Sequence, residues 1–551
     1  MIFDNCDLKF SPLRCRCQLY YIMRVLLINP FYPISETPSP PLGLAYLASA
    51  LTAAGTEVKI LDLVVFPYSQ SKLKTLIEDF KPQVAGITAV TMTFDNAINV
   101  VKDIKRIDPH ILTVMGGPHV SFCARETLNA CPQLDIIVLG EGERTIVELV
   151  LAAHNGHAWI GVDGIAFRNP TDICFTAKRK PIENLDELPL PDRRLLPLGR
   201  YRALGMPISL TTSRGCPYKC IFCVGRKMVG AKVRYRSAVN IVDELEYLND
   251  LNFHQINIAD DLFTTNKHHC TAVCDEIIKR GLQLKWTSFA RVDTVSDAVL
   301  TKMKTAGCSA VSFGIETANP QILKTIKKGI TLKQVEDAVN MCKRAAILPF
   351  ASFILGLPGE TQETIKETKE FANRLKKKGL SFGFHLLAPF PGSEVREFSR
   401  QYGIKILTND WSQYHANRAI VETPSVDQRT LDDIVVKWEA EYDDYLSDIQ
   451  VRMAKEKATK DEIWEIENLE RIVLVYDLMM KGVIEEKGYE RRRKSPVTEK
   501  ALLTLLSKKI CQTADYDPQR LYETLSDAVQ QGNLKYVNKK GKIKWQWVDY
   551  L

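Results

Sequence analysis

The sequence predicts an α/β protein with two parallel-sheet domains in tandem, followed by a mainly helical C-terminal domain. Apolar segments of strand length alternate with segments of helical periodicity over residues 23–150 and again over residues 206–400. Such alternation is typical of parallel sheets covered by helices. A chain of 551 residues also exceeds the size at which one hydrophobic core stops growing, so several domains are expected.

The composition is that of an ordinary globular protein, with 45% hydrophobic and 25% charged residues. No apolar run reaches 18 residues, so we expect no membrane span. Residues 1–22 lack the features of a signal peptide and are predicted to be an extension before the first domain. The fourteen cysteines are scattered along a chain without a secretory signal, which predicts a cytoplasmic protein with mostly buried thiols.

The first domain opens with a strand at Arg24–Asn29 and a helix that ends near Gly55. Further strands at 57–61, 84–87 and 111–115 alternate with helices, which indicates a parallel, doubly wound sheet. The G-x-G-x-x-G fingerprint of dinucleotide binding does not follow the first strand. This absence argues against a nicotinamide or flavin site.

Loops rich in glycine and small polar residues follow the strands of this domain, at the edge where parallel sheets bind ligands. Glycine lets the backbone approach a large flat ligand closely. Turn chemistry explains any one of these loops, but several loops on one rim favour a ligand site. The loop residues assigned to this site are Thr88, Thr91, Gly116, Gly117, His119, Gly140, Glu141, Gly142 and Glu143, and Pro40 and Leu42 lie in the Pro-rich loop before the first helix.

Three cysteines, Cys216, Cys220 and Cys223, stand at C-x3-C-x2-C spacing in one loop at the start of the second domain. Iron–sulfur clusters normally take four thiolates, so a group of three indicates a cluster with one iron open to a non-protein ligand. A zinc site would need further Cys or His ligands nearby, and the sequence offers none. We therefore predict a [4Fe–4S] cluster on this loop.

Residues 151–205 are predicted to be a linker, and residues 206–400 a partial (βα)6 barrel of the TIM type. About six strand–helix units follow the cysteine loop, and each strand ends in polar or glycine residues. In parallel barrels this face carries the active site. Cys270 and Cys274 lie one helical turn apart in this domain and are expected to be core or surface residues rather than a second metal pair.

The cysteine loop closely resembles the signature of radical S-adenosylmethionine (SAM) enzymes. The loops at 40–43, 116–119 and 140–143 resemble the Rossmann-like cobalamin-binding domain of the cobalamin-dependent members of that family. The resemblance covers about residues 24–420 and implies three cofactors: a [4Fe–4S] cluster, SAM and cobalamin. It also implies the residues that bind SAM, which are Phe222, Asp260, Arg291, Gly314 and Glu316.

In this family a 5'-deoxyadenosyl radical abstracts a substrate hydrogen and methylcobalamin delivers a methyl group. By resemblance we predict an anaerobic methyltransferase acting on an unactivated sp3 carbon. A protein side chain, the glutamine of methyl-coenzyme M reductase, is our choice of substrate, and a small molecule stays open. A cyclase or oxidase of the magnesium-protoporphyrin monomethyl ester cyclase type is the alternative enzyme. An external electron donor is an expected partner.

Residues 401–551 are predicted to be helical, with a winged-helix-like end formed by two helices and a hairpin. Residues 481–551 hold fifteen Lys and Arg against nine Asp and Glu, a net charge of +6 that includes the run Arg491–Lys494. A solvated surface is the default interpretation of such charge. Docking of a protein substrate is favoured over nucleic acid, and a nucleic-acid-binding regulatory module is the non-enzymatic alternative.

Three further side chains are predicted to have structural or surface positions without a role in the reaction. His110 follows Asp108 as in part of a known cobalt-ligating motif, but its position before a strand favours a solvated turn. His385 is expected to be a satisfied barrel histidine. Trp411 is expected to pack rather than to bind substrate.

Overall fold

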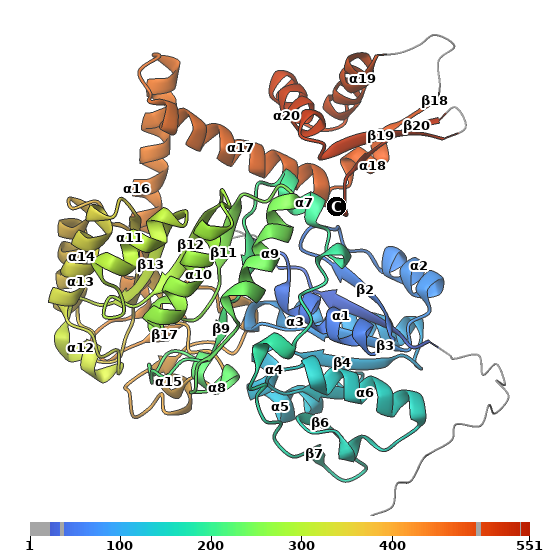
Figure 1. Ribbon diagram of the computed structural model, residues 1–551, viewed down its shortest axis with the longest axis horizontal. Helices are drawn as coiled ribbons and strands as arrows, with labels where there is room; N and C mark the ends of the chain where they lie inside the picture. Colours follow the sequence, from blue (N-terminus) through green and yellow to red (C-terminus); the bar gives the residue numbers. More distant parts are fainter. Residues whose placement is uncertain (1–21, 33–37, 492–497, 540–541) are drawn as a thin grey trace, which may run out of the picture.

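The computed structural model describes residues 22–32, 38–491, 498–539 and 542–551. The first domain lies beside the barrel, and the C-terminal helices cross above both (Figure 1). The two parallel sheets confirm the predicted α/β fold class. Apart from Ile22, the predicted N-terminal extension lies outside the described residues.

The first domain is a sheet in which five parallel strands lie between helices. The buried strand β1 (Arg24–Asn29) lies between β2 and β3, and its side chains alternate between two cores. Val25 and Leu27 pack with α1 and α6, whereas Leu26 and Ile28 pack with α2 and α3. The other parallel strands are β2 (Glu57–Asp62), β3 (Val84–Thr88), β4 (Leu112–Gly116) and β5 (Ile136–Val138). The helices are α1 (Leu42–Ala53), α2 (Gln70–Phe80), α3 (Phe94–Ile107), α4 (Pro118–Phe122), α5 (Ala124–Ala130) and α6 (Glu143–Asn155).

The segment predicted to be a linker contributes two strands to this sheet. β6 (Ile165–Arg168) pairs antiparallel with β5, and β7 (Ile173–Phe175) pairs antiparallel with β6. Ile165, Ala166 and Ile173 are buried and extend the apolar cores of the first domain. The strands are only four and three residues long, which is too short for a periodic signal in the sequence.

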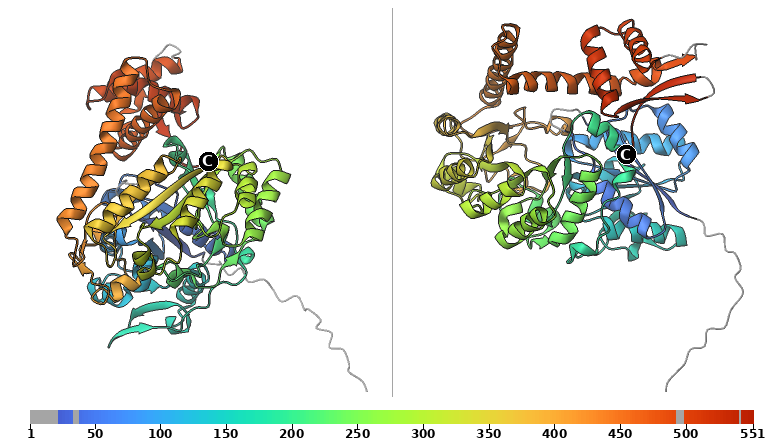
Figure 2. Two further views of the ribbon diagram at one scale, coloured as in Figure 1. Left: turned by 90° about the vertical axis from the view of Figure 1, so that its left-hand side faces the viewer. Right: turned by 45° about the horizontal axis from the view of Figure 1, so that its top comes forward.

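The second domain is a six-stranded, all-parallel sheet in the order β15-β14-β13-β12-β11-β8. Figure 2 shows its helices along the outer side of the sheet. Cys270 and Cys274 are fully buried, so they are core residues. The strands are β8 (Ile208–Leu210), β11 (Gln255–Ile258), β12 (Lys285–Ala290), β13 (Cys308–Glu316), β14 (Leu348–Leu355) and β15 (Ser381–Leu386). The helices between them are α9 (Ala238–Asp250), α10 (Lys267–Lys279), α11 (Asp297–Thr305), α12 (Pro320–Thr325), α13 (Leu332–Arg344) and α14 (Gln362–Lys376).

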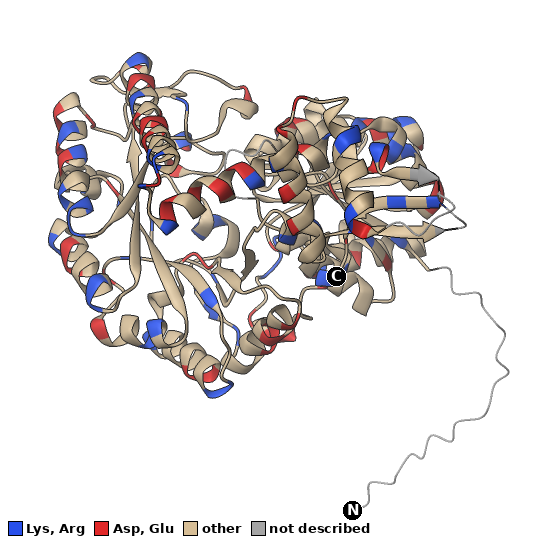
Figure 3. Cartoon of the chain, turned by 90° about the horizontal axis from the view of Figure 1, so that it is seen from above, with Lys and Arg blue, Asp and Glu red and all other residues tan. Residues whose placement is uncertain are grey.

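Charged residues of both signs lie mainly on the outer helices, while the strands are mostly uncharged (Figure 3). This is the distribution expected when a parallel sheet is buried between layers. Among the described residues no helix combines the length and the apolar character that crossing a bilayer requires.

The C-terminal region consists of two long helices, α16 (Gln428–Ala454) and α17 (Lys460–Met480), and a terminal module. The predicted helices α19 (Glu499–Cys511) and α20 (Pro518–Gln530) precede the predicted hairpin of β19 (Leu534–Lys539) and β20 (Lys542–Trp547). A third strand, β18 (Tyr489–Arg491), was not predicted and pairs with β20. The module packs on α7 (Leu198–Ala203) and on Val64 and Val65 of the first domain. Beyond Arg491, the basic run lies outside the described residues.

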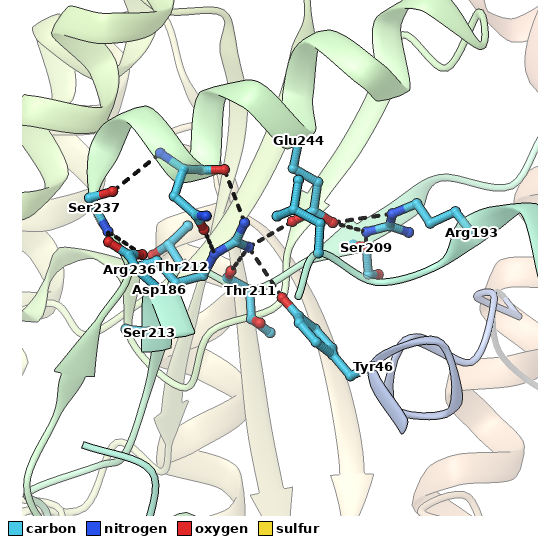
Figure 4. Close-up of polar contacts among 12 residues, drawn as sticks. Tyr46, Asp186, Arg193, Ser209, Thr211, Thr212, Ser213, Arg236, Ser237 and Glu244 are labelled. Atoms are coloured by element: carbon cyan, nitrogen blue, oxygen red, sulfur yellow. Dashed lines mark hydrogen bonds and ion pairs between the residues drawn. The ribbon is translucent and has the colours of Figure 1, made fainter. Parts of the chain in front are cut away.

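The buried carboxylate of Glu244 links the segment before β8, the barrel helix α9 and the first-domain helix α1 (Figure 4). Glu244 on α9 is 1% exposed and accepts hydrogen bonds from Arg193 at 2.5 Å and Arg236 at 2.7 Å. Arg236 also donates to the hydroxyl of Tyr46 on α1 at 3.3 Å, and Arg193 donates to the carbonyl of Ser209 on β8 at 2.7 Å. Glu244 therefore connects the barrel to the first domain.

We predict that Glu244→Ala destabilises the protein by about 3–5 kcal/mol, because it leaves two buried guanidinium groups without their counter-ion. Chemical denaturation with a probe in each domain measures the loss. Glu246→Ala on the same helix is the matched control, since Glu246 pairs with Arg280 at the surface and should cost at most about 1 kcal/mol. An equal, small effect of both substitutions would contradict the prediction.

Candidate functional site

The cysteine loop is fixed by backbone hydrogen bonds on both sides. It runs from β9 (Ser213–Arg214) to the short helix α8 (Gly225–Val229). The amide of Ile221 donates to the carbonyl of Ile326 at 3.2 Å, and the carbonyl of Ile221 accepts from Val395 at 2.9 Å. Ile221 is fully buried, so this residue anchors the loop on the barrel.

The three thiols of the loop are free, with Cys216 and Cys220 half-buried and Cys223 exposed. The amide of Gly225 donates to Cys223 Sγ at 3.3 Å. Within the described ranges no three Cys, His, Asp or Glu side chains converge on the site of a single metal ion. A cluster places a separate iron behind each thiolate and needs no such convergence. The loop therefore fits an iron–sulfur cluster better than a zinc ion.

Asp260 supports this loop rather than facing a ligand. It is 2% exposed, and its carboxylate accepts from the amides of Thr212 at 2.6 Å and Ser213 at 3.2 Å and from both hydroxyls. Burial raises the pKa of Asp260 despite these bonds. The structure shows Asp260 in a structural role, its predicted contact with SAM stays a prediction, and its neighbour Asp261 lines the adjacent cavity.

Glu316 ends β13 in a strained conformation with φ of +71° and is 5% exposed. Its carboxylate accepts from Lys328 Nζ at 2.6 Å, so the two form a buried ion pair. A Cβ on Gly314 would lie 2.4 Å from Glu316 Oε1 and 2.8 Å from Lys328 Nζ, so a larger residue there would displace the ends of this ion pair. The ring of Phe222 lies 6.0 Å from the same ammonium. Lys328 is a site residue that the sequence did not reveal.

The side chain of Arg291 already binds other residues of the protein. Its guanidinium donates twice to Asp293, at 2.9 Å each, and once to the carbonyl of Lys328 at 2.8 Å. It also lies 3.7 Å above the ring of Tyr218 in the cysteine loop. The structure thus makes Arg291 an anchor of the loop, with few donors left for the carboxylate of a ligand.

A cavity of about 610 Å³ separates the two sheets. Its lining on the barrel side includes Arg214, Val224, Gly225 and Asp261, which flank the cysteine loop. Seven predicted rim residues line the opposite side: Thr88, Gly116, Gly117, Gly140, Glu141, Gly142 and Glu143. An adjoining cavity of about 430 Å³ includes Thr91. Pro40 and Leu42 line neither cavity, whereas their neighbours Pro41 and Gly43 line the larger one.

The rim of the first domain can accept a large flat group. Gly117 has φ of +108°, and a Cβ there would lie 2.6 Å from the carbonyl of Ala89, so the chain must carry glycine at this turn. Much of the remaining lining is apolar, including Leu27, Leu47 and Val114. A glycine edge over an apolar floor suits the face of a macrocycle.

The two glutamates of this rim join the domains. Glu141 accepts two hydrogen bonds from Arg234, at 3.0 and 2.7 Å, and Glu143 accepts one from Arg214 at 2.6 Å. Burial raises the pKa of Glu141, but bonds from Arg234 and the amide of Ile182 and the nearby arginine charges outweigh it and lower the pKa. Both carboxylates bind arginines of the barrel domain, and Glu143 Oε2 is buried without a hydrogen-bond partner among the described residues.

His119 lies away from the interdomain cavity and lines a separate one of about 440 Å³. It is 2% exposed, its Nδ1 lies 3.2 Å from the hydroxyl of Thr91, and its ring packs between Phe94 and Trp411. Burial and the charge of Arg396 lower its pKa to about 4. The predicted assignment of His119 to the rim site is therefore not supported by its position. His110 lies exposed in a turn, as expected.

Comparison with known proteins gives the same domain order. A model described as "B12 binding domain" matches residues 35–150, and one described as "Radical SAM superfamily" matches residues 210–372. An uncharacterized methyltransferase of Pyrococcus horikoshii is 37% identical over 401 residues, 71% of this chain and 86% of that protein. The anaerobic magnesium-protoporphyrin IX monomethyl ester cyclase of Rubrivivax gelatinosus is 31% identical over 431 residues, 75% of this chain and 76% of that protein.

The fold also resembles a solved structure of the radical SAM methyltransferase TsrM from Kitasatospora setae with cobalamin and a [4Fe–4S] cluster bound. The match has a TM-score of 0.62 at 19% identity and covers 93% of this chain and 100% of that chain. At this identity the likeness concerns the fold.

The lowered pKa of His119 predicts a pH-dependent stability. Below pH 6.5 the unfolded chain binds a proton at this side chain, whereas the folded chain does so only near pH 4, so stability falls as the pH drops between these values. His119→Phe keeps the ring packing and should flatten this slope by up to about 1.4 kcal/mol per pH unit. Urea unfolding between pH 4 and 7 measures it. His110→Phe should leave the slope unchanged, and a slope that His119→Phe also leaves unchanged would refute the assignment.

Proposed function

Because the chain belongs to the radical SAM superfamily and carries the B12-binding domain of its cobalamin-dependent members, we propose that it methylates an unactivated sp3 carbon. Its cofactors are a [4Fe–4S] cluster, SAM and cobalamin. The observation that carries the proposal is the single cavity lined on one side by the glycine rim and on the other by the flanks of the cysteine loop. A substrate in that cavity lies within reach of both halves of the protein.

Cys216, Cys220 and Cys223 would hold the cluster, and the rim at Thr88, Gly116–Gly117 and Gly140–Gly142 would hold cobalamin. When bound, the cluster with SAM supplies the radical that removes a hydrogen atom, and cobalamin supplies the methyl group. The protein contributes the position of these groups and a largely apolar, water-poor space between them.

The Glu316–Lys328 pair would recognise the amino-acid end of SAM. A carboxylate and an ammonium 2.6 Å apart are complementary to an ammonium and a carboxylate on one carbon. Glu316 would then pair with the ammonium of SAM and Lys328 with its carboxylate. We prefer Lys328 to Arg291 as the partner of the SAM carboxylate because Arg291 already donates two hydrogen bonds to Asp293.

For the substrate we propose a protein side chain, with the glutamine of methyl-coenzyme M reductase as the first compound to test. Methyl transfer is favoured over cyclisation because the relative named as a methyltransferase shares 37% identity over 86% of its length. The cyclase relative, at 31% identity, keeps ring formation as the second candidate.

Anaerobic turnover with SAM that carries a deuterated methyl group tests the function. We expect a peptide spanning the glutamine to gain one labelled methyl group, with formation of 5'-deoxyadenosine, and Cys216→Ala to abolish both. Ring closure without a gain of label would favour the cyclase. Binding of nucleic acid that is strongly salt-dependent and indifferent to Cys216→Ala would favour the regulatory module.

The role of Lys328 predicts a change in selectivity. Lys328→Met should weaken equilibrium binding of SAM at least tenfold, about 1.4 kcal/mol, and leave binding of decarboxylated SAM nearly unchanged, since only the former carries the carboxylate. Lys328→Arg should retain part of the preference. Calorimetric titration of the cluster-loaded protein measures both ligands. Equal losses for the two ligands would indicate a structural role only.

A further inference from the structure

We propose that the basic surface beside Cys223 is the docking site of an acidic one-electron-transfer protein. The proposal rests on the proposed function, because the cluster must be reduced by one electron for each radical that forms. We call this surface the basic mouth: the residues Lys178, Arg179, Lys180 and Lys227 around a cavity of about 350 Å³.

The basic mouth lies directly beside the cysteine loop. Lys227 belongs to α8, which starts two residues after Cys223, and the first amide of α8 donates to Cys223 Sγ at 3.3 Å. Arg226 of the same helix donates to the carbonyl of Pro217, inside the loop, at 2.6 Å. A partner at the mouth is therefore a few residues from the most exposed of the three cysteines. Electron transfer weakens steeply with distance, so this is the place where a donor must bind.

The charge of this surface is strongly one-sided. Lys178 and Lys180 are exposed, as is Lys219 between the first two cysteines. The acidic residues paired at the surface are few: Glu148 binds Arg179, Glu397 binds Lys227 at 2.7 Å, and Glu183 binds Lys232 at 2.9 Å. The basic residues around the loop and the cavity outnumber these three carboxylates and Glu141, which lines the same cavity and pairs with Arg234. These basic residues are Lys178, Arg179, Lys180, Lys219, Arg226, Lys227 and Lys232. A positive surface of this kind attracts an acidic partner and accelerates its association.

An exposed aromatic ring completes the surface. Phe175 at the end of β7 lines the same cavity and is 45% exposed, with the guanidinium of Arg125 5.5 Å from its ring. An apolar ring within a basic rim is the usual composition of a protein-docking patch. Redox partners typically bind through small, transient interfaces, so no extensive apolar face is required.

The reaction at the mouth is a simple electron transfer. One electron leaves the reduced donor and enters the cluster, so the donor is oxidised by one unit and the cluster is reduced by one, and no proton or bond changes. An anionic substrate that enters through the mouth is the competing occupant. The same cavity shares Gly140, Glu141, Met228 and Val229 with the interdomain cavity, so the two occupants must be separated by experiment.

The test compares a protein donor with a small one. In the cluster-loaded enzyme, the charge reversal Lys178→Glu/Lys180→Glu should slow reduction by an acidic ferredoxin or flavodoxin at least tenfold at low salt and weaken its dependence on salt. Reduction by photoreduced deazaflavin, a small molecule that needs no docking, should be unchanged. Stopped-flow absorbance of the cluster measures both rates.

The matched control is Lys376→Glu/Lys377→Glu. These two exposed lysines end α14 at the amino-terminal ends of the strands, opposite the cysteine loop, and should leave both rates unchanged. The proposal is overturned if the protein donor reduces the variant at the wild-type rate, or if the control slows it equally. It is also overturned if turnover with deazaflavin is lost, because the mouth then receives substrate. Failure of wild-type enzyme to form 5'-deoxyadenosine would instead count against the proposed function.

Discussion

Two arginines, one half-buried and one buried, determine the shape of this protein's active region. Arg214 precedes the cysteine loop and Arg234 follows it, and both bind glutamates on the rim of the first domain. Charges this deeply buried must be paired, so the two domains cannot separate here without a large cost. The distance between the cysteine loop and the glycine rim is therefore fixed by ion pairs. The cavity between them is the consequence.

Two further buried carboxylates, those of Asp260 and Glu244, stabilise the segments that flank the cysteine loop. Asp260 accepts hydrogen bonds from the amides and hydroxyls of Thr212 and Ser213. Glu244 accepts hydrogen bonds from Arg193 and Arg236, which lie before and after the first barrel strand in the sequence. None of these carboxylates is free to bind a ligand. They make the loop rigid, which is what a site needs when two reactive groups must meet one substrate atom.

The sequence was sufficient for the features that depend on local spacing. The three cysteines, the glycines of the rim and the alternation of strands and helices all lie within short stretches, and their placement in one interdomain region agrees with the predicted architecture. It was insufficient where a partner comes from a distant segment. Lys327 and Lys328 are indistinguishable in the sequence, yet one forms a surface pair with Glu394 and the other is buried against Glu316. For the same reason the sequence does not reveal the partners of Glu141 and Asp260, which lie 93 and 48 residues away.

The C-terminal module also contributes to the interactions that hold the cavity in shape. Tyr201, buried under the module, donates to Asp62 at 2.6 Å, and Asp62 accepts from Asn29 at 2.8 Å. Burial raises the pKa of Asp62 to about 6 in spite of these bonds. Asn29 lines the cavity between the domains. Loss of the module would expose Tyr201 and the apolar residues around it. Asp62 would then be held less firmly, and so would Asn29, which lines the cavity. The module therefore supports the active region through this chain of hydrogen bonds, whatever else binds to its basic surface.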